Sequence, residues 1–259
     1  MINKISSKDN SLFKYARKLN QKANFRKKEK KFIVEGQKEI ELCLKSNFII
    51  DMIFISNKKK SKKIDKPNIQ IYEIDDNLIK KIIYRESEGV FAIVNYKYFD
   101  IEKLKLNDDE LFLILENPEK PGNIGAIMRT FEASGFKNLV LSDSNVEIFN
   151  PNTIRASLGS IFSLNIFQTK TNEIINFLGK NNFKIYSSYI KSNTDYKKID
   201  FKKRCAIVMG PEKSSINNQF IKKSDKLLSI PIHGKVDSLN LSVATAIILY
   251  EALNQRKFS

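Results

Sequence analysis

The chain of 259 residues carries 45 Lys and Arg against 29 Asp and Glu, a formal net charge of +16. Hydrophobic residues make up 42% and aromatic residues 10%, which is enough to bury a core and excludes a wholly disordered or fibrous chain. Two cysteines and one histidine exclude a disulfide framework and argue against a metal site, so we expect no metal.

The charge balance also bears on partners and on location. An excess of basic residues favours a polyanionic partner, with nucleic acid first and an anionic membrane surface second. No apolar run approaches the length of a transmembrane helix, and the N-terminus lacks the apolar stretch of a secretory signal. We therefore expect a cytoplasmic protein without a membrane partner.

The first 31 residues carry the densest positive charge, with eleven Lys and Arg against two acids. Leu12, Ala16, Leu19 and Ala23 recur at helical spacing, which predicts a basic helical segment over residues 1–30. This charge favours contact with phosphate groups, and a solvated amphipathic helix is the alternative. The candidate phosphate-binding residues are Lys14, Arg17, Lys18, Lys22, Arg26, Lys27 and Lys28.

Residues 31–98 have the pattern of a small α/β domain. A lysine-rich stretch over 57–67 predicts an exposed loop, and residues 99–110 lack an apolar period and predict a domain linker. The expected strands are 31–34, 51–56, 69–74 and 90–94, and the expected helices are 35–45 and 75–84.

Residues 111–259 alternate between strand and helix patterns, which predicts an α/β domain with a mostly parallel sheet and helices on both faces. The run at 111–115 is continuously apolar, as expected for a strand that is covered on both faces. The other expected strands are 138–141, 164–167, 183–188, 205–209 and 226–230, and the expected helices are 124–134, 152–158, 171–178 and 238–253.

A first candidate site segment follows the strand at 111–115. A turn with Pro121 and Gly122 leads into a helix that Asn123 can cap, and Arg129 lies six residues further on. Six residues rotate a helix by about 600°, so Arg129 lies some 120° around the helix from Asn123. The alternative is an ordinary junction between a strand and a helix, with an exposed arginine.

Two further segments also follow predicted strands. Gly210 and Glu212 come after the strand at 205–209, and a turn with an exposed glutamate is the alternative. After the strand that ends at Ile230, Asp237 or Ser238 can cap a helix. Ser238, Leu239 and Asn240 precede small residues that permit close packing of this helix. The alternative is an N-capped helix of the core without a functional role.

Taken together, the three segments are more specific than each is separately. The order Asn-x-Gly-x-x-x-Arg, then Gly-x-Glu about 80 residues on, then Ile-Pro and Ser-Leu-Asn-x-Ser-x-Ala resembles the SpoU/TrmH family of RNA ribose 2′-O-methyltransferases over residues 111–254. Residues 1–98 are similar to the N-terminal substrate-binding part of its ribosomal-RNA members. There a basic segment precedes Phe32-Ile33-Val34-Glu35-Gly36, and Ser87-Glu88-Gly89-Val90 begins the closing stretch.

The resemblance implies a fold, a cofactor and partners. It implies a SPOUT-type α/β domain over 111–259 with a deep trefoil knot that holds S-adenosylmethionine, and a domain of the ribosomal L30e/L7Ae type over 31–98. It also implies a homodimer that methylates a ribose 2′-hydroxyl, most simply in 23S ribosomal RNA. By position, it implies catalytic roles for Asn123, Arg129, Glu212, Ser238 and Asn240, and cofactor contacts at Ser188, Gly210, Ile230 and Leu239.

One departure from the family pattern leaves alternatives open. Members usually carry glycines after the glutamate, whereas this chain reads Lys213-Ser214-Ser215, and a non-glycine residue at a positive φ is strained. A non-catalytic RNA-binding or ribosome-assembly protein on the same fold is therefore one alternative. A transfer-RNA methyltransferase is another, although the transfer-RNA members generally lack the N-terminal domain.

Overall fold

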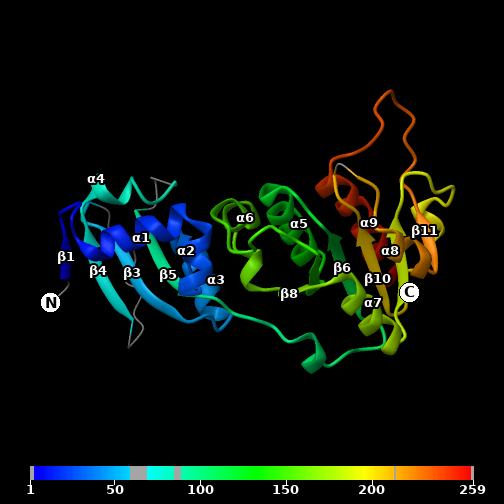
Figure 1. The fold of residues 1–259 in the computed structure, drawn as a ribbon, viewed down its shortest axis with the longest axis horizontal. Helices are drawn as coiled ribbons and strands as arrows, with labels where there is room; N and C mark the ends of the chain where they lie inside the picture. Colours follow the sequence, from blue (N-terminus) through cyan, green and yellow to red (C-terminus); the bar gives the residue numbers. More distant parts are fainter. Residues whose placement is uncertain (1–2, 59–68, 85–88, 213, 258–259) are drawn as a thin grey trace. The chain divides into compact units, whose positions relative to one another are not determined.

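The computed structural model describes residues 3–58, 69–84, 89–212 and 214–257, and the chain divides into two compact units. The first unit consists of residues 1–97 and 148–162, and the second of residues 98–147 and 163–259 (Figure 1). Most of the lysine-rich stretch at 57–67, and Ser87 and Glu88 of the family pattern, lie outside the described residues.

The first unit is built on a five-stranded mixed sheet. Its strand order is β1-β4-β3-β5-β2, in which β1, β4 and β3 run parallel, and β5 pairs antiparallel with both β3 and β2. β1 pairs with β4 from Asn3 opposite Tyr72 to Ile5 opposite Ile74, so β1 is an edge strand of the sheet. The strands are β1 (Asn3–Ile5), β2 (Lys31–Glu35), β3 (Ile50–Ser56), β4 (Gln70–Ile74) and β5 (Val90–Asn95).

The basic N-terminal segment is part of this unit. The sequence analysis had instead divided the chain at residue 30 and treated this segment as a separate part. Phe13, Ala16 and Leu19 of α1 are buried in the same core cluster as Ile33 of β2 and Phe91 of β5. This apolar side of α1 anchors the helix, and the basic residues occupy its exposed side. The helices that precede residue 98 are α1 (Ser11–Gln21), α2 (Ala23–Glu29), α3 (Gln37–Lys45) and α4 (Asp76–Ile79).

Residues 148–162 also belong to the first unit, whereas the sequence division had placed them in the second domain. They form α6 (Pro151–Ser157) and a 3-10 turn, η2 (Ser160–Phe162). Phe149 stacks on Phe32 of β2 with ring centroids 4.2 Å apart, and Phe162 meets Phe48 at 5.2 Å. The sequence pattern shows that these rings are apolar, but it does not show which core they enter.

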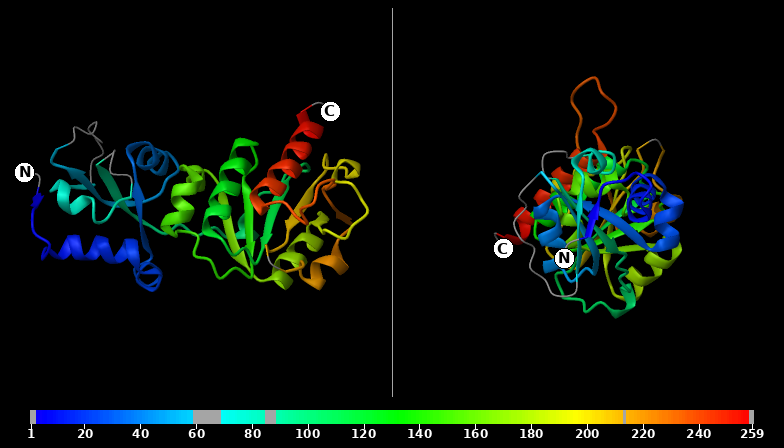
Figure 2. Two further views of the ribbon diagram at one scale, coloured as in Figure 1. Left: turned by 90° about the horizontal axis from the view of Figure 1, so that it is seen from above. Right: turned by 90° about the vertical axis from the view of Figure 1, so that its left-hand side faces the viewer.

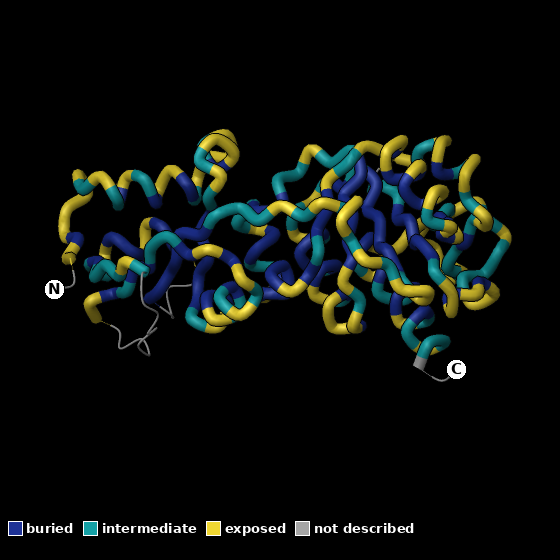
Figure 3. The backbone as a smooth tube through the Cα atoms, turned by 90° about the horizontal axis from the view of Figure 1, so that it is seen from below, coloured by how far each residue is buried: buried dark blue, intermediate teal, exposed yellow. Residues whose placement is uncertain are grey.

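The second unit has a six-stranded parallel sheet in the order β11-β9-β10-β6-β7-β8. β6 and β10 are buried along their whole length, and Figure 3 shows in dark blue the buried parts of the chain. The mostly parallel sheet that the alternating pattern predicts is therefore confirmed. The strands are β6 (Leu111–Glu116), β7 (Asn138–Ser142), β8 (Asn165–Thr169), β9 (Lys184–Ser188), β10 (Cys205–Met209) and β11 (Lys226–Leu228).

Helices cover both faces of this sheet (Figure 2). α5 (Pro121–Ala133) and α9 (Leu241–Lys257) pack on each other, while α7 (Thr171–Lys180) and α8 (Asn218–Lys223) pack on the face that Phe112 and Ile114 present.

The predicted linker is not a free connection, because Phe99, Ile101 and Leu104 pack on the same core. The sequence analysis did not predict β1 or α8. Within the described residues, no helix has the length and apolarity needed to cross a membrane.

Candidate active site

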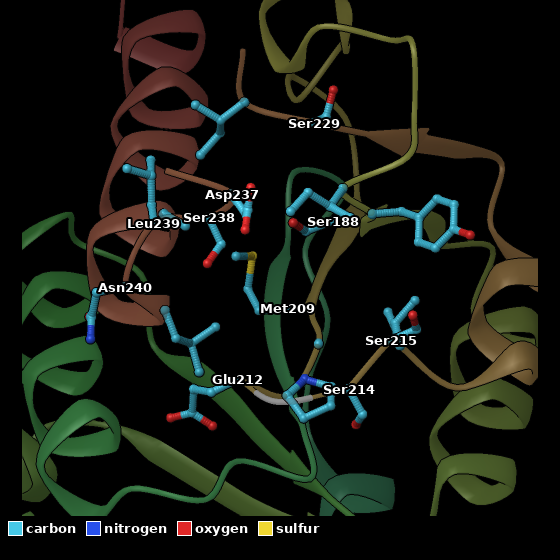
Figure 4. A pocket seen from close by; sticks show the side chains of 18 of the residues that line it. Ser188, Met209, Glu212, Ser214, Ser215, Ser229, Asp237, Ser238, Leu239 and Asn240 are labelled. Atoms are coloured by element: carbon cyan, nitrogen blue, oxygen red, sulfur yellow. The ribbon is translucent and has the colours of Figure 1, made fainter. Parts of the chain in front are cut away.

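A cavity of about 710 Å³ opens in the second unit where β9, β10 and β11 end (Figure 4). The carboxyl ends of parallel strands form one edge of the sheet, so the segments that follow these strands meet there. Ser188 ends β9, Gly210 and Glu212 follow β10, and Ile230 follows β11. The segment before α9 adds Ser238, Leu239 and Asn240 to the wall.

Glu212 is held in place by two groups from the segment that follows β6. The side-chain amide of Asn123 donates to Oε1 of Glu212 at 2.8 Å, and the backbone N–H of Glu119 donates to Oε2 at 3.2 Å. Both carboxylate oxygens therefore accept a hydrogen bond across 89 and 93 residues of sequence. This contact joins the first and second of the predicted motifs.

The third motif joins the same network through Asn240. Its side-chain amide donates to Oδ1 of Asn123 at 3.3 Å, and its own Oδ1 accepts from the backbone N–H of Ser242 at 2.9 Å. The hydroxyl of Ser242 donates to the same Oδ1 at 2.6 Å. One chain of hydrogen bonds thus runs from Ser242 through Asn240 and Asn123 to Glu212, and it sets the orientation of both amides.

Two predicted helix caps were wrong. α5 begins at Pro121 with Lys120 as its N-cap, so Asn123 lies inside the first turn and its side chain turns to Glu212. Proline favours the first helical position because its missing N–H would be unpaired there in any case. α9 begins at Leu241, and Asn240 caps it rather than Ser238 or Asp237.

All four predicted cofactor-binding residues line the cavity: Ser188, Gly210, Ile230 and Leu239. At Gly210, an added Cβ would lie 3.2 Å from Cβ of Ile216, so the glycine permits close packing of the loop that follows. The sequence analysis did not identify Lys120, Met209, Ile216 or Asp237 as cavity residues, although they also line it. Their position at strand ends next to a motif is the signal that could have identified them.

The serines that replace the family's glycines are not strained. Ser214 and Ser215 line the cavity, and neither has a positive φ, so the strain predicted for a non-glycine residue does not arise at these two positions. Lys213 lies outside the described residues.

Glu116 lies beside the site at the end of β6 and is buried. Burial raises the pKa of this carboxyl, a hydrogen bond from the backbone of Asn217 lowers it, and the negative charge of Asp143 raises it further. Its Oε2 atom has no hydrogen-bond partner among the described residues. A charged carboxylate is therefore unfavourable at this position.

Arg129 does not join the cluster of motif residues. It is exposed on α5 and is not among the residues that line the cavity. The helical rotation that separates it from Asn123 accounts for this placement. In this structure Arg129 is available to a ligand that approaches from solvent.

Six of the seven predicted RNA-binding residues are exposed in the first unit, and Arg26 is the exception. Arg26 is 2% exposed, and its guanidinium donates to the backbone carbonyls of Leu19 at 2.7 Å and Asn20 at 3.0 Å. These carbonyls lie in the last turn of α1, where a positive charge is favourable. Arg26 therefore stabilises the end of α1, and its prediction as an RNA contact was wrong.

A parallel α/β sheet with polar residues from several strand ends around one cavity defines an α/β protein with a ligand-binding site. Residues 110–250, more than half of the chain, match the SpoU rRNA methylase family, and residues 10–92 match the MRM3-like substrate binding domain. The chain belongs to the SpoU rRNA methylase family.

Three relatives illustrate the range of this similarity. The chain is 26% identical to the 23S rRNA (guanosine(2553)-2′-O)-methyltransferase RlmP of Bacillus subtilis over 96% of this chain and 98% of that one. It is 33% identical to a tRNA (guanosine(18)-2′-O)-methyltransferase of Thermus thermophilus, over 60% of this chain and 80% of that one. Its fold matches the AdoMet-bound rRNA methyltransferase from Sinorhizobium meliloti with a TM-score of 0.90 and 25% identity, over 98% of each chain.

Proposed function

We propose that this protein transfers a methyl group from S-adenosylmethionine to a ribose 2′-hydroxyl of 23S ribosomal RNA. The observation that carries the proposal is the hydrogen-bonded chain Asn240–Asn123–Glu212, which brings the three family motifs to one cavity. The same proposal places the enzyme in the cytoplasm, where its substrate would be. We also propose that the second unit contains the trefoil knot and that the first unit has the L30e-like fold.

The residues around the cavity fit the cofactor. The volume lies within the range of small-molecule sites, and Met209, Ile216 and Leu239 offer an apolar surface to an adenine ring. Glu212 and Asp237 supply negative charge, which suits a ligand with a sulfonium and an ammonium group. When bound, S-adenosylmethionine supplies a methyl group that is already activated by the positive sulfur.

The protein therefore has to position the ribose and stabilise the charge that develops on its oxygen. We assign that task to Arg129, because it is exposed on α5 and a guanidinium can bind a phosphate through two parallel hydrogen bonds. A guanidinium stays protonated in water, so Arg129 is not assigned as the base. Glu212, Asn123 and Asn240 hold the loops together, and Ser238 presents its hydroxyl at the cavity wall.

Ribosomal RNA is favoured over transfer RNA as the substrate. The relative named for transfer RNA is aligned with only 60% of this chain, whereas the relative named for 23S rRNA is aligned with 96% of it. The match to a substrate-binding domain over residues 10–92 supports the same choice. A non-catalytic RNA-binding role would leave the hydrogen-bonded cavity without a use.

We further propose that the enzyme is a homodimer that uses α9. Apolar residues are spread around this helix rather than gathered on one stripe, and Val243 and Tyr250 are left about half exposed. The two residues are seven positions apart, so they lie on one face of the helix. An exposed apolar face of this kind favours contact with a second copy of the chain.

The test compares Arg129→Ala with the wild-type protein. We expect methyl transfer to a 23S rRNA transcript to fall by roughly two to three orders of magnitude, the effect of losing one preorganised electrostatic donor. Affinity for S-adenosylhomocysteine, measured by calorimetry, should not change, because Arg129 lies outside the cavity wall. Arg129→Lys should restore little activity.

Two results would contradict the proposal. Near-normal turnover by the alanine variant would remove Arg129 from the catalytic set. No detectable binding of S-adenosylmethionine by the wild-type protein at millimolar ligand would favour the non-catalytic alternative. Mapping of ribose methylation in cellular RNA, with and without the gene, would then identify the modified nucleotide.

A further inference from the structure

The fold of the first unit brings together three segments that each carry an exposed cation. Lys8 precedes α1, Arg17 lies within α1, and Lys81 follows α4. All three are exposed. Of the three, only Arg17 is among the candidate phosphate-binding residues named from the sequence, and Lys81 lies far from the basic N-terminal segment, so the grouping is a product of the fold.

Two hydrogen bonds bring these segments together. The N–H of Asp75, just before α4, donates to the carbonyl of Ile5 at 3.0 Å, which fixes the chain entering α1 beside the start of α4. At the other end of α1, the side-chain amide of Asn20 donates to the carbonyl of Ile82. Buried Phe13, and Ile79 of α4, belong to the same core cluster beneath.

The position of Arg17 on the helix follows from these contacts. Arg17 and Asn20 are three residues apart, so they lie within about 60° of each other on the same flank of α1. Because Asn20 binds the carbonyl of Ile82, this flank faces the turn that contains Lys81. Lys18 lies on the opposite flank, where its ammonium group is 5.8 Å from the ring centroid of Phe25.

The positive charge of the cluster is not neutralised by the neighbouring acids. Asp9 is paired with Lys14 at 2.8 Å, and Asp76 is paired with Lys80 at 3.1 Å. Within the described part of the chain, Lys8, Arg17 and Lys81 form no ion pair with an acid. The interaction with Lys8, burial and the charge of Arg17 lower the pKa of Lys81, as expected for cations on neighbouring segments.

We propose that Lys8, Arg17 and Lys81 form a binding site for one backbone phosphate of the substrate RNA. Like charges on neighbouring segments repel one another, and an anion placed between them removes the repulsion while accepting charge-assisted hydrogen bonds. A phosphodiester supplies that anion without reference to base sequence, so the site positions the RNA and does not read it. This site rests on the proposed function, because its ligand is taken to be the RNA substrate.

The experiment uses the full-length protein with the double substitution K8Q/K81Q. The matched control is K38Q/K45Q, which removes the same charge from two exposed lysines of α3 in the same unit. Affinity for a 23S rRNA transcript is measured by fluorescence anisotropy across a series of salt concentrations. Urea unfolding shows whether both variants keep the stability of the wild-type protein.

We expect K8Q/K81Q to weaken RNA binding about tenfold near 0.1 M salt and to reduce the slope of log K against log salt by about 0.7 to 0.9, the effect of one phosphate contact. At about 1 M salt the difference should disappear, because salt screens the contact. The control should change the affinity less than about twofold.

A second measurement does not depend on affinity. Because its pKa is lowered, Lys81 should react with a limiting amine-acylating reagent faster than Lys38 does, and bound RNA should protect Lys81 but not Lys38. Inorganic phosphate at the same phosphate concentration should protect Lys81 less than RNA does. Equal protection would identify a free-phosphate site and overturn the proposal.

The remaining outcomes separate the phosphate site from the proposed function. An unchanged slope in K8Q/K81Q, or an equal loss in the control, would overturn the phosphate site while methyl transfer by the wild-type protein still stood. If the wild-type protein bound RNA through this cluster but did not bind S-adenosylmethionine, the proposed reaction would fail and the site would stand.

Discussion

Glu116 and Glu212 show how a carboxylate beside the cavity and one in its wall differ in environment. Glu212 is half-buried, and each of its oxygens accepts a hydrogen bond, from Asn123 and from the backbone of Glu119. Glu116 is 7% exposed, and its Oε2 atom has no partner among the described residues. Both oxygens of Glu212 are therefore paired, whereas a charged carboxylate is unfavourable at Glu116.

This difference predicts a pH dependence for Glu116→Gln. Burial raises the pKa of Glu116 in the folded state, so the folded protein holds this proton more tightly than the unfolded chain does. The wild-type protein therefore loses stability as the pH rises above the unfolded pKa, and the loss is complete above the raised folded pKa. A neutral glutamine avoids that loss, so the variant should gain stability relative to the wild-type protein as the pH rises from 4.5 toward neutrality.

The measurement is the free energy of unfolding in urea at several pH values. Glu132→Gln, at an exposed position on α5, is the control and should show no such trend. A stability difference for Glu116→Gln that does not depend on pH would show that Glu116 has the same pKa in the folded and unfolded states, which would contradict the prediction.

At the scale of elements, α1 and α2 show why neighbouring basic residues have different roles. Arg26 and Lys27 are adjacent in sequence on α2, but Arg26 points inward to the end of α1 while Lys27 is exposed. Helical rotation of about 100° between successive residues produces this separation. A charge count over the segment cannot detect it.

We expect Arg26→Met to lower the free energy of unfolding by about 2–3 kcal/mol, because hydrogen bonds from a charged group to buried carbonyls are lost. Lys27→Ala should change stability by less than about 0.5 kcal/mol and should weaken RNA binding in a salt-dependent way. Urea unfolding and fluorescence anisotropy measure the two effects. Equal stability of the two variants would contradict the structural role of Arg26.

On the scale of the whole molecule, the proposed dimer makes a prediction about α9. The double substitution V243D/Y250D places two charges on the exposed apolar face and should prevent association, which sedimentation velocity measures as a shift from dimer to monomer. The matched control is N172D/N176D, which adds the same charge at two exposed polar residues of α7 and should leave the dimer intact. A monomeric wild-type protein, or a dimeric V243D/Y250D variant, would contradict the assignment of α9.

The division into units makes a second prediction at this scale. A fragment of residues 1–97 lacks Phe149 and Phe162, which pack on Phe32 and Phe48. It should be less stable by about 3 kcal/mol or more than a chain in which a Gly/Ser linker joins residues 1–97 to 148–162, since burying each ring contributes about 1.5–3 kcal/mol. Urea unfolding of the two fragments tests this, and equal stability would show that residues 148–162 are not part of the core.

The sequence by itself determined the parallel α/β class and the family of the second unit. Alternating strand and helix patterns depend on local periodicity, and β10 was predicted with the bounds that the structure shows. The motif residues Asn123, Glu212 and Asn240 were also identified from the sequence, because their order along the chain is specific. Their hydrogen bonds were not, since they join residues up to 117 positions apart.

Only the tertiary structure decided which unit the segment 148–162 joins, which arginine is buried, and which cations meet on the surface. Each of these depends on contacts between residues that are distant in sequence, and local patterns carry no information about such contacts. Arg26 has the same charge as its neighbours but points toward the end of α1. The segments that carry Lys8 and Lys81 are neighbours because β1 pairs with β4. Side-chain direction and strand pairing, rather than composition, determine these features.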